Sequence, residues 1–259
     1  MMLLHGGAFS LAIDNQRSTP WQDLTPQARI LCVVIMAMAI ALTPNGHWLT
    51  WGTYSIGILS TVLVSQVTLS VLLQRLAVEL SFVSVVLLGT LFREGGDILW
   101  QWGIVSITTT GLTILGSVTL KALLSLLLLN VLTLTTPVTD LLQGLKTLKT
   151  PVLLVAILAS MYRYLGVLIE EFNAMRRAAV SRNLMIGRRW QRLVVGNMIG
   201  SLFIRTYERG ERVHQAMLSR GYQGLPFFQE SPKNTGYDLI ALSLTVLFAI
   251  AGQVAYWVV

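Results

Sequence analysis

Long apolar blocks dominate this chain and set the strongest limit on its fold. The blocks at 49–73, 98–136 and 238–258 each reach the roughly 20 residues that a helix needs to cross the hydrocarbon core of a bilayer. Blocks of this length are too long to be core strands of a soluble domain. Only 12% of the 259 residues are charged and 54% are hydrophobic, whereas soluble domains carry about 25% charged residues. The sequence therefore predicts an all-α, polytopic membrane protein.

Cap and turn signals divide the first half of the chain. Thr25 is placed as an N-cap with Pro26 at the first helical position, and Pro44-Asn45-Gly46 ends the helix that follows. Apolar segments come next at 49–73, 76–92 and 98–136, with a loop at 93–97. The last segment can hold one long or two shorter helices, and we favour a short helix at 98–110 before a full-length one. With the helices of the second half, about five or six transmembrane helices are expected.

A helix restart follows at Thr135-Thr136-Pro137. Thr136 can cap a helix that Pro137 opens, and Asp140 suits the positive first turn of that helix. Leucines at helical spacing within 141–148 predict a short amphipathic helix in the membrane interface.

Two long helices are then expected. Beyond residue 164 the apolar positions narrow to a stripe with the spacing 3, 4, 3, 4, which is typical of a helix with one buried face. The stripe consists of Leu165, Leu168, Phe172, Met175 and Ala179. We expect this helix to leave the membrane and continue in the cytoplasm to Arg182, and a basic turn at 187–192 to precede a second helix from about 193 to 220. Gly196 and Gly200 of the second helix would allow another helix to cross closely.

Positive charge is concentrated in the same region. Residues 143–233 hold fourteen Lys/Arg against five Asp/Glu, a balance of +9, while the rest of the chain carries −2. The positive-inside rule explains a basic stretch between apolar blocks without nucleic acid, which we do not expect as a partner. The basic stretch is therefore placed in the cytoplasm, and the final span would leave Val259 outside.

One short pattern closes both long helices. The two copies lie 38 residues apart and read Ala-x-x-Ser-Arg followed by Asn or Gly: Ser181, Arg182, Asn183 and Ser219, Arg220, Gly221. Helix capping alone explains one copy, since Arg near a C-terminus complements the macrodipole and Asn or Gly ends helices. Two copies favour docking, because the planar guanidinium suits carboxylates and carbonyls of a partner.

The sequence contains no recognisable catalytic set. Cys32 is the only cysteine and the three histidines are far apart, so no metal site or cofactor is expected in this chain. Among the intramembrane charges, Glu79 and Lys121 are predicted to contact each other as a structural pair. Glu170 and Glu171 are adjacent, point about 100° apart, and are interpreted as a solvated or salt-bridged face.

These patterns suggest five parts. They are an N-terminal segment (1–29), transmembrane helices (30–136), a short amphipathic helix with a transmembrane helix (137–168), a cytoplasmic module (169–235) and a final transmembrane helix (236–259).

The second half resembles the transmembrane T component of energy-coupling factor (ECF) transporters, the CbiQ/EcfT family. The resemblance rests on Thr-Thr-Pro before the amphipathic helix, Ala-x-x-Ser-Arg-Asn, and Ala-Met-Leu-Ser-Arg-Gly-Tyr-Gln-Gly at 216–224. The family's usual form is Ala-Arg-Gly-like, and Ser-Arg-Asn and Ser-Arg-Gly stand in those places here. The strong match covers roughly a third of the chain.

The resemblance implies a scaffold rather than an enzyme. In this family, two cytoplasmic coupling helices seat their arginine-bearing ends in grooves of two ABC ATPases, here CbiO-like, and move a separate substrate-binding membrane subunit, here CbiM-like. An optional small accessory membrane subunit completes the partners. The resemblance also implies that Arg182 and Arg220 anchor the ATPases. It further implies that the ends of the two helices are shaped by Ser181, Asn183, Ser219 and Gly221.

Several alternatives remain open at this point. Chain length and likeness to the cobalt-type members of the family favour cobalt as the substrate, with nickel or biotin as the alternative. The expected location is the cell (inner) membrane. A self-contained channel or secondary transporter would need a polar path through the spans. A membrane-embedded enzyme would need a catalytic cluster.

Overall fold

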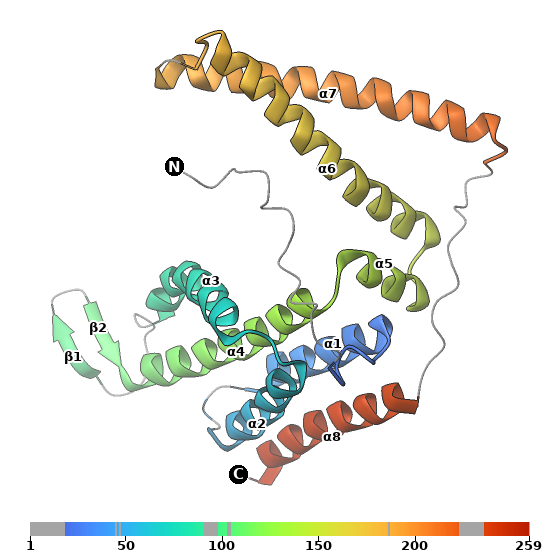
Figure 1. Ribbon diagram of the computed structural model, residues 1–259. Helices are drawn as coiled ribbons and strands as arrows, with labels where there is room; N and C mark the ends of the chain where they lie inside the picture. Colours follow the sequence, from blue (N-terminus) through green and yellow to red (C-terminus); the bar gives the residue numbers. More distant parts are fainter. Residues whose placement is uncertain are drawn as a thin grey trace. The chain divides into compact units, whose positions relative to one another are not determined.

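The computed structural model describes residues 19–44, 46, 48–90, 98–102, 105–185, 187–222 and 236–258 (Figure 1). The expected loop at 93–97, the end of the motif at 223–224, and most of the N-terminal segment 1–29 lie outside these residues, as do His5, His47 and Val259. The described elements are α1 (Pro26–Leu42), α2 (Trp48–Ser65), α3 (Leu69–Thr90), β1 (Ile98–Trp102), β2 (Val105–Thr108), α4 (Thr109–Thr135), α5 (Val138–Thr147), α6 (Val152–Ser181), α7 (Arg188–Ser219) and α8 (Gly236–Val258). The all-α fold class is confirmed, with one short hairpin added.

The chain forms two compact units. The first comprises Met1–Gly144 and Ser231–Val259 and is called the bundle unit; the second, Leu145–Glu230, is called the arm unit. The bundle unit holds α1 to α4, α8, the hairpin and most of α5, and the arm unit holds α6 and α7. Bundle and arms are therefore built from different helices.

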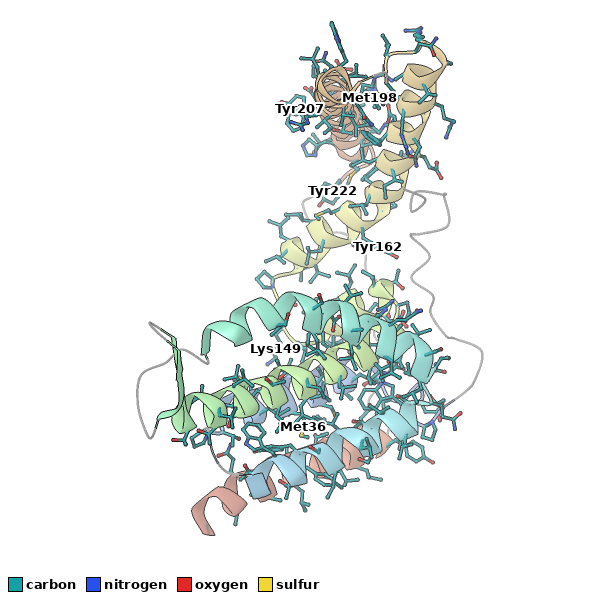
Figure 2. All side chains as sticks on the ribbon, turned by 90° about the vertical axis from the view of Figure 1, so that its left-hand side faces the viewer. Met36, Lys149, Tyr162, Met198, Tyr207 and Tyr222 are labelled. Atoms are coloured by element: carbon teal, nitrogen blue, oxygen red, sulfur yellow. The ribbon has the colours of Figure 1, made fainter. Side chains whose placement is uncertain are left out.

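In the bundle unit, helices from both ends of the chain lie together. α8 packs against α1 and α2, while α4 packs against α1, α2 and α3 (Figure 1). Met36 of α1 lies inside this packing (Figure 2). The buried apolar core contains Trp21, Leu24, Cys32, Val33, Met36, Ala39, Ile40, Trp51, Tyr54, Ile58, Leu124, Leu128, Val131 and Leu132.

A close approach in this core joins α2 and α8. Tyr54 is 0% exposed, and a Cβ added at Gly252 would lie 2.3 Å from Cζ of its ring. The Tyr54 hydroxyl is 3.4 Å from Nε2 of Gln253 and 3.4 Å from Oγ1 of Thr43, so a buried polar group keeps partners. Glycine at 252 is what lets the tyrosine ring lie against the backbone of α8.

Both units contain helices that are long enough to span a membrane. Within the described residues, Gly111–Thr135, Val152–Ser181 and Gly236–Val254 are long and apolar enough to cross a bilayer, and Pro26–Leu42 is a shorter apolar helix. The chain is thus polytopic, as expected. The full number of five or six spans stays a prediction.

The prediction of a short helix at 98–110 is wrong. Residues within 98–108 form the antiparallel β1–β2 hairpin, and α4 begins directly after it and runs for 27 residues. The segment is rich in β-branched and aromatic residues, which favour strands. As a helix it would also be too short to cross a bilayer.

A buried cation joins the start of α1 to the end of α4. Arg29 is 6% exposed, and its guanidinium donates to the carbonyl oxygens of Leu24 at 3.1 Å and Gln22 at 2.6 Å. It also donates to Oγ1 of Thr136 at 3.1 Å and, at 3.5 Å, to the carbonyl of Thr135. The Thr-Thr-Pro restart is therefore a docking point for Arg29.

A second polar contact joins the starts of α1 and α8. Thr25 occupies the N-cap position of α1, and Pro26 opens the helix, as predicted. The Thr25 hydroxyl does not cap its own helix, however, because it and the Thr25 backbone N–H both donate to the carboxylate of Asp238 at 2.9 Å. These two hydrogen bonds hold the starts of the first and last helices of the bundle unit together in a buried contact.

Candidate functional site

The end of α6 closes in a Schellman motif. Arg182 is the C-cap, and Asn183 takes a left-handed conformation with φ +56°. The Asn183 N–H donates to the carbonyl of Val180, and the Leu184 N–H donates to that of Ala179, both at 3.0 Å. The expected role of Asn183 as a left-handed helix stop is confirmed.

The end of α7 repeats this geometry. Arg220 is the C-cap, and Gly221 takes φ +82°. The Gly221 N–H donates to the carbonyl of Leu218, and the Tyr222 N–H donates to that of Met217, both at 3.0 Å. Two helix ends 38 residues apart therefore share one backbone structure.

The serines of the two motifs are also equivalent. Oγ of Ser181 donates to the carbonyl of Ala178, and Oγ of Ser219 donates to that of Ala216, each at 2.9 Å. Each serine thus bonds the backbone carbonyl of the residue three positions earlier. The hydroxyls are turned back onto their own helices and are held there, beside the arginine that follows.

Both arginines face outward. Arg182 and Arg220 are exposed, and across the described part of the chain neither guanidinium is held by a carboxylate or carbonyl. An exposed guanidinium on a rigid helix end can donate a planar fork of hydrogen bonds to a partner. We call the two ends, 181–183 and 219–221, the Ser-Arg tips.

The arms that carry the tips are paired helices. α6 runs unbroken for 30 residues and α7 for 32, and the two pack against each other. The predicted stripe on α6 is confirmed, since Ala179 is buried and its other members are half-buried. On α7, Met198 is buried in the contact, while Tyr207 is 69% exposed (Figure 2).

The predicted start of α7 is corrected. The expected basic turn at 187–192 is helical from Arg188, and only Gly187, with φ +84°, remains outside the helix. Arginine, tryptophan and glutamine are acceptable in a helix, so the positive-φ glycine decides where the turn ends.

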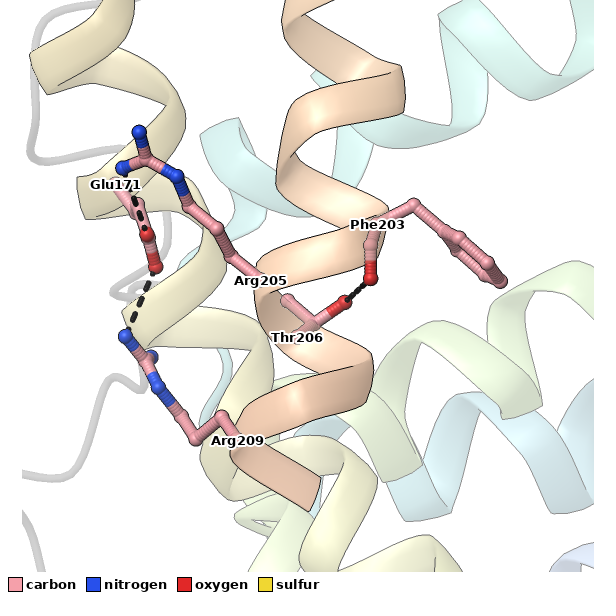
Figure 3. Close-up of polar contacts among 5 residues, drawn as sticks. All are labelled: Glu171, Phe203, Arg205, Thr206 and Arg209. Atoms are coloured by element: carbon pink, nitrogen blue, oxygen red, sulfur yellow. Dashed lines mark hydrogen bonds and ion pairs between the residues drawn. The ribbon is translucent and has the colours of Figure 1, made fainter. Parts of the chain in front are cut away.

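One carboxylate links the two arms (Figure 3). On α6, Oε1 of Glu171 is 3.5 Å from Nη1 of Arg205, and Oε2 accepts a hydrogen bond from Nη2 of Arg209 at 3.1 Å. The two arginines are one turn apart on α7, so both reach the same side chain. Glu171 is 18% exposed, which makes this pair less screened by water than a fully exposed one.

Among the described residues, no helix crosses closely at Gly196 and Gly200, where a close approach is predicted. Both glycines are exposed, and a Cβ added at either would meet no atom within 4 Å. α6 instead contacts the face of α7 that carries Met198, because the half-buried side chains of both helices lie there. The two glycines lie on the uncovered face.

The predicted contact between Glu79 and Lys121 is replaced by two other contacts. Oε2 of Glu79 accepts from Nδ2 of Asn130 at 2.7 Å, and Nζ of Lys121 lies 5.6 Å from the centroid of the Trp51 ring. Lys121 and Asn130 are nine residues apart on α4, about 13 Å along its axis, so Glu79 on α3 meets the second and not the first.

The described residues hold no group of three His, Cys, Asp or Glu side chains that could bind a metal. The polar clusters in this part of the chain hold helices together, and the exposed cations lie on the arms.

Two charged residues gained importance only from the structure. Arg29 lies in the predicted N-terminal segment, although a cation in the first turn of an apolar helix is a signal of a buried partner. Glu170 and Glu171 are predicted together as a solvated or salt-bridged face, and their spacing does not distinguish which of the two faces α7. The signal for Glu171 was its place beside the α6 stripe, one residue before Phe172.

A family model described as cobalt transport protein, CbiQ, matches residues 17–232. The chain belongs to the CbiQ family. Two uncharacterized proteins of Methanocaldococcus jannaschii are similar to it over a shorter stretch: MJ1571, 36% identical over 77 residues, and MJ1089, 36% identical over 74. Each match covers 29% of this chain, and 26% and 28% of the relatives, so it spans about a quarter of their length. The description of the family names cobalt transport.

Proposed function

We propose that this CbiQ-family chain is the transmembrane coupling (T) subunit of an ECF-type ABC importer. It transmits movements of two CbiO-like ATPases to a separate, CbiM-like substrate-binding membrane subunit. The observation that carries the proposal is the pair of Ser-Arg tips, because two exposed arginines on identical helix ends suit a partner that offers two equivalent grooves.

The cargo we propose is cobalt ion, with nickel and then biotin as alternatives. The family description supports cobalt. The partner subunit would bind the cargo, since no candidate metal ligands converge in the described residues. The proposed location is the cell (inner) membrane, with the arm unit in the cytoplasm by the positive-inside rule and the last helix ending outside.

The test removes the two tip arginines and leaves the rest of the helices that carry them unchanged. Arg182→Ala with Arg220→Ala should abolish ATPase co-purification and ATP-driven cobalt uptake, while membrane insertion is retained. Arg177→Ala with Arg212→Ala removes the same charge from exposed positions on α6 and α7, and it should leave both measurements near wild type. If the tip variant keeps its ATPases and its uptake, the anchor role is wrong.

Two further measurements separate the alternatives. Uptake assays with cobalt, nickel and biotin, run with all subunits present, identify the cargo. Flux through liposomes containing this chain alone would instead support a self-contained channel or secondary transporter.

A further inference from the structure

The ion pair between the arms joins equivalent positions of the internal repeat. Arg182 and Arg220 are related by a shift of 38 residues, and so are Glu171 and Arg209. Each tip arginine thus follows its own half of the Glu171–Arg209 pair by eleven residues. At 1.5 Å per residue, each arm extends about 16 Å from the pair to its tip.

Contact between equivalent positions has a specific geometric meaning. When two similar helices are related by a two-fold axis, a residue meets its own equivalent only where the axis passes. The Glu171–Arg209 contact meets this condition at one point, and two tip-bearing segments of equal length extend beyond it. The C-terminal ends of α6 and α7 lie on opposite sides of that unit (Figure 1), as two equal arms about a shared centre would place them.

The rest of the contact supplies little that would fix this register. The α6 stripe is made mostly of half-buried apolar side chains, which pack without strong directional preference. The paired arginines at 205 and 209 give Glu171 a partner on each oxygen (Figure 3). A carboxylate shared by two guanidiniums restrains both sliding and rotation of one helix on the other.

We propose that Glu171 is a positioning residue that fixes the register of α6 on α7, and so keeps the two Ser-Arg tips at equal reach from the ion pair. Its functional consequence rests on the proposed ATPase docking: tips held at a fixed spacing transmit closure of a two-fold partner, whereas loosened tips bind it without moving together. In this role Glu171 acts through α7, which binds both of its carboxylate oxygens, and not by binding an ATPase.

The spacing of the tips can be measured in the full chain alone, reconstituted in nanodiscs. Spin labels at Val180→Cys and Leu218→Cys, in a Cys32→Ala background, report the distance between exposed and equivalent positions beside the tips. Wild type should give one narrow distance distribution by pulsed electron paramagnetic resonance. Glu171→Gln should broaden and shift it, while Glu170→Gln, which removes the neighbouring exposed carboxylate, should leave it unchanged.

A reversed pair separates the ion pair from general damage to the helix. Glu171→Arg with Arg209→Glu is built in an Arg205→Gln background, so that the new arginine meets no like charge. It should restore the narrow distribution that Glu171→Arg alone loses. A distribution that stays narrow in Glu171→Gln, or that the reversed pair fails to restore, overturns the proposal.

In the assembled transporter, Glu171→Gln should lower uptake per ATP hydrolysed by roughly three- to tenfold, with the ATPases still bound. The two proposals fail separately. If Glu171→Gln broadens the distance distribution but the chain binds no ATPase, the positioning role holds and the coupling function is refuted. If the distribution is unchanged but ATPase binding depends on Arg182 and Arg220, the coupling function holds and the positioning role is refuted.

Discussion

Some helix glycines of the bundle unit lie in close packing contacts, whereas the described glycines of the arm unit do not. In the bundle unit, a Cβ at Gly252 would lie 2.3 Å from Tyr54, and one at Gly144 would lie 2.8 Å from Cδ1 of Ile30. In the arm unit, Gly200 and Gly210 have nothing within 4 Å of that position. Glycine therefore permits close packing in the bundle, whereas in the arms the chain itself supplies no neighbour that requires it.

Arginines show the same contrast. Arg29 is buried, and every hydrogen bond described above ends on the backbone or hydroxyl of its own unit. Arg182 and Arg220 are exposed on rigid helix ends. The bundle binds Arg29 internally, while the arms present the tip arginines to solvent, so loss of Arg29 should cost stability and loss of the tip arginines should cost assembly.

The largest stability effect is expected at Arg29. Arg29→Ala would leave the carbonyls of Gln22 and Leu24 without their donor in a buried site, which should cost about 4 kcal/mol of unfolding free energy. Thermal unfolding of the purified chain in detergent measures the loss, with Arg177→Ala as the exposed control. Equal melting temperatures for both variants would show that the bundle does not depend on this cation.

Gly252→Ala should follow closely. The added methyl group overlaps the Tyr54 ring, so α2 and α8 must separate, at a cost of about 3 kcal/mol. The same thermal unfolding assay reports it, and Tyr54→Leu should partly rescue the variant because it removes the clashing ring atoms. A variant as stable as wild type would mean that the packing of the bundle is looser than described.

A smaller effect is expected at Asn130. Asn130→Leu removes the donor to Glu79 and leaves a half-buried carboxylate unpaired, at a cost of about 2 kcal/mol. Adding Glu79→Leu should recover part of that loss, because the unpaired charge is then gone. Strictly additive losses in this double-mutant cycle would contradict the contact.

The smallest effect, of opposite sign, is expected in the arms. Gly200→Ala meets open space in a helix interior, so the isolated chain should be unchanged or stabilised by up to about 1 kcal/mol. The helical content and melting temperature of the isolated chain measure this. A clear destabilisation would show that another part of the chain covers the glycine face, and the contrast between the units would then fail.

Periodicity and capping chemistry predicted the arms well. The stripe from Leu165 to Ala179 and the stops at Asn183 and Gly221 depend on spacing and on residue-specific backbone preferences, which act over a few neighbouring residues. Length and hydropathy likewise predicted the apolar helices, because the thickness of a bilayer sets them. The short helix expected at 98–110 failed, since a brief apolar run does not distinguish a helix from a strand.

The class of fold, the two long arms and the repeated ends that mark the candidate site thus follow from the sequence alone. Which charged groups meet depends on the packing of the helices: Glu79 contacts Asn130 rather than Lys121, Arg29 contacts the Thr-Thr-Pro restart, and Glu171 contacts Arg209. The two side chains in each of these contacts lie 38 or more residues apart along the chain. Only some carbonyl acceptors of Arg29 lie near it in the sequence. Helix periodicity gives the face of a side chain, but the rotation and offset of packed helices decide which side chain it faces.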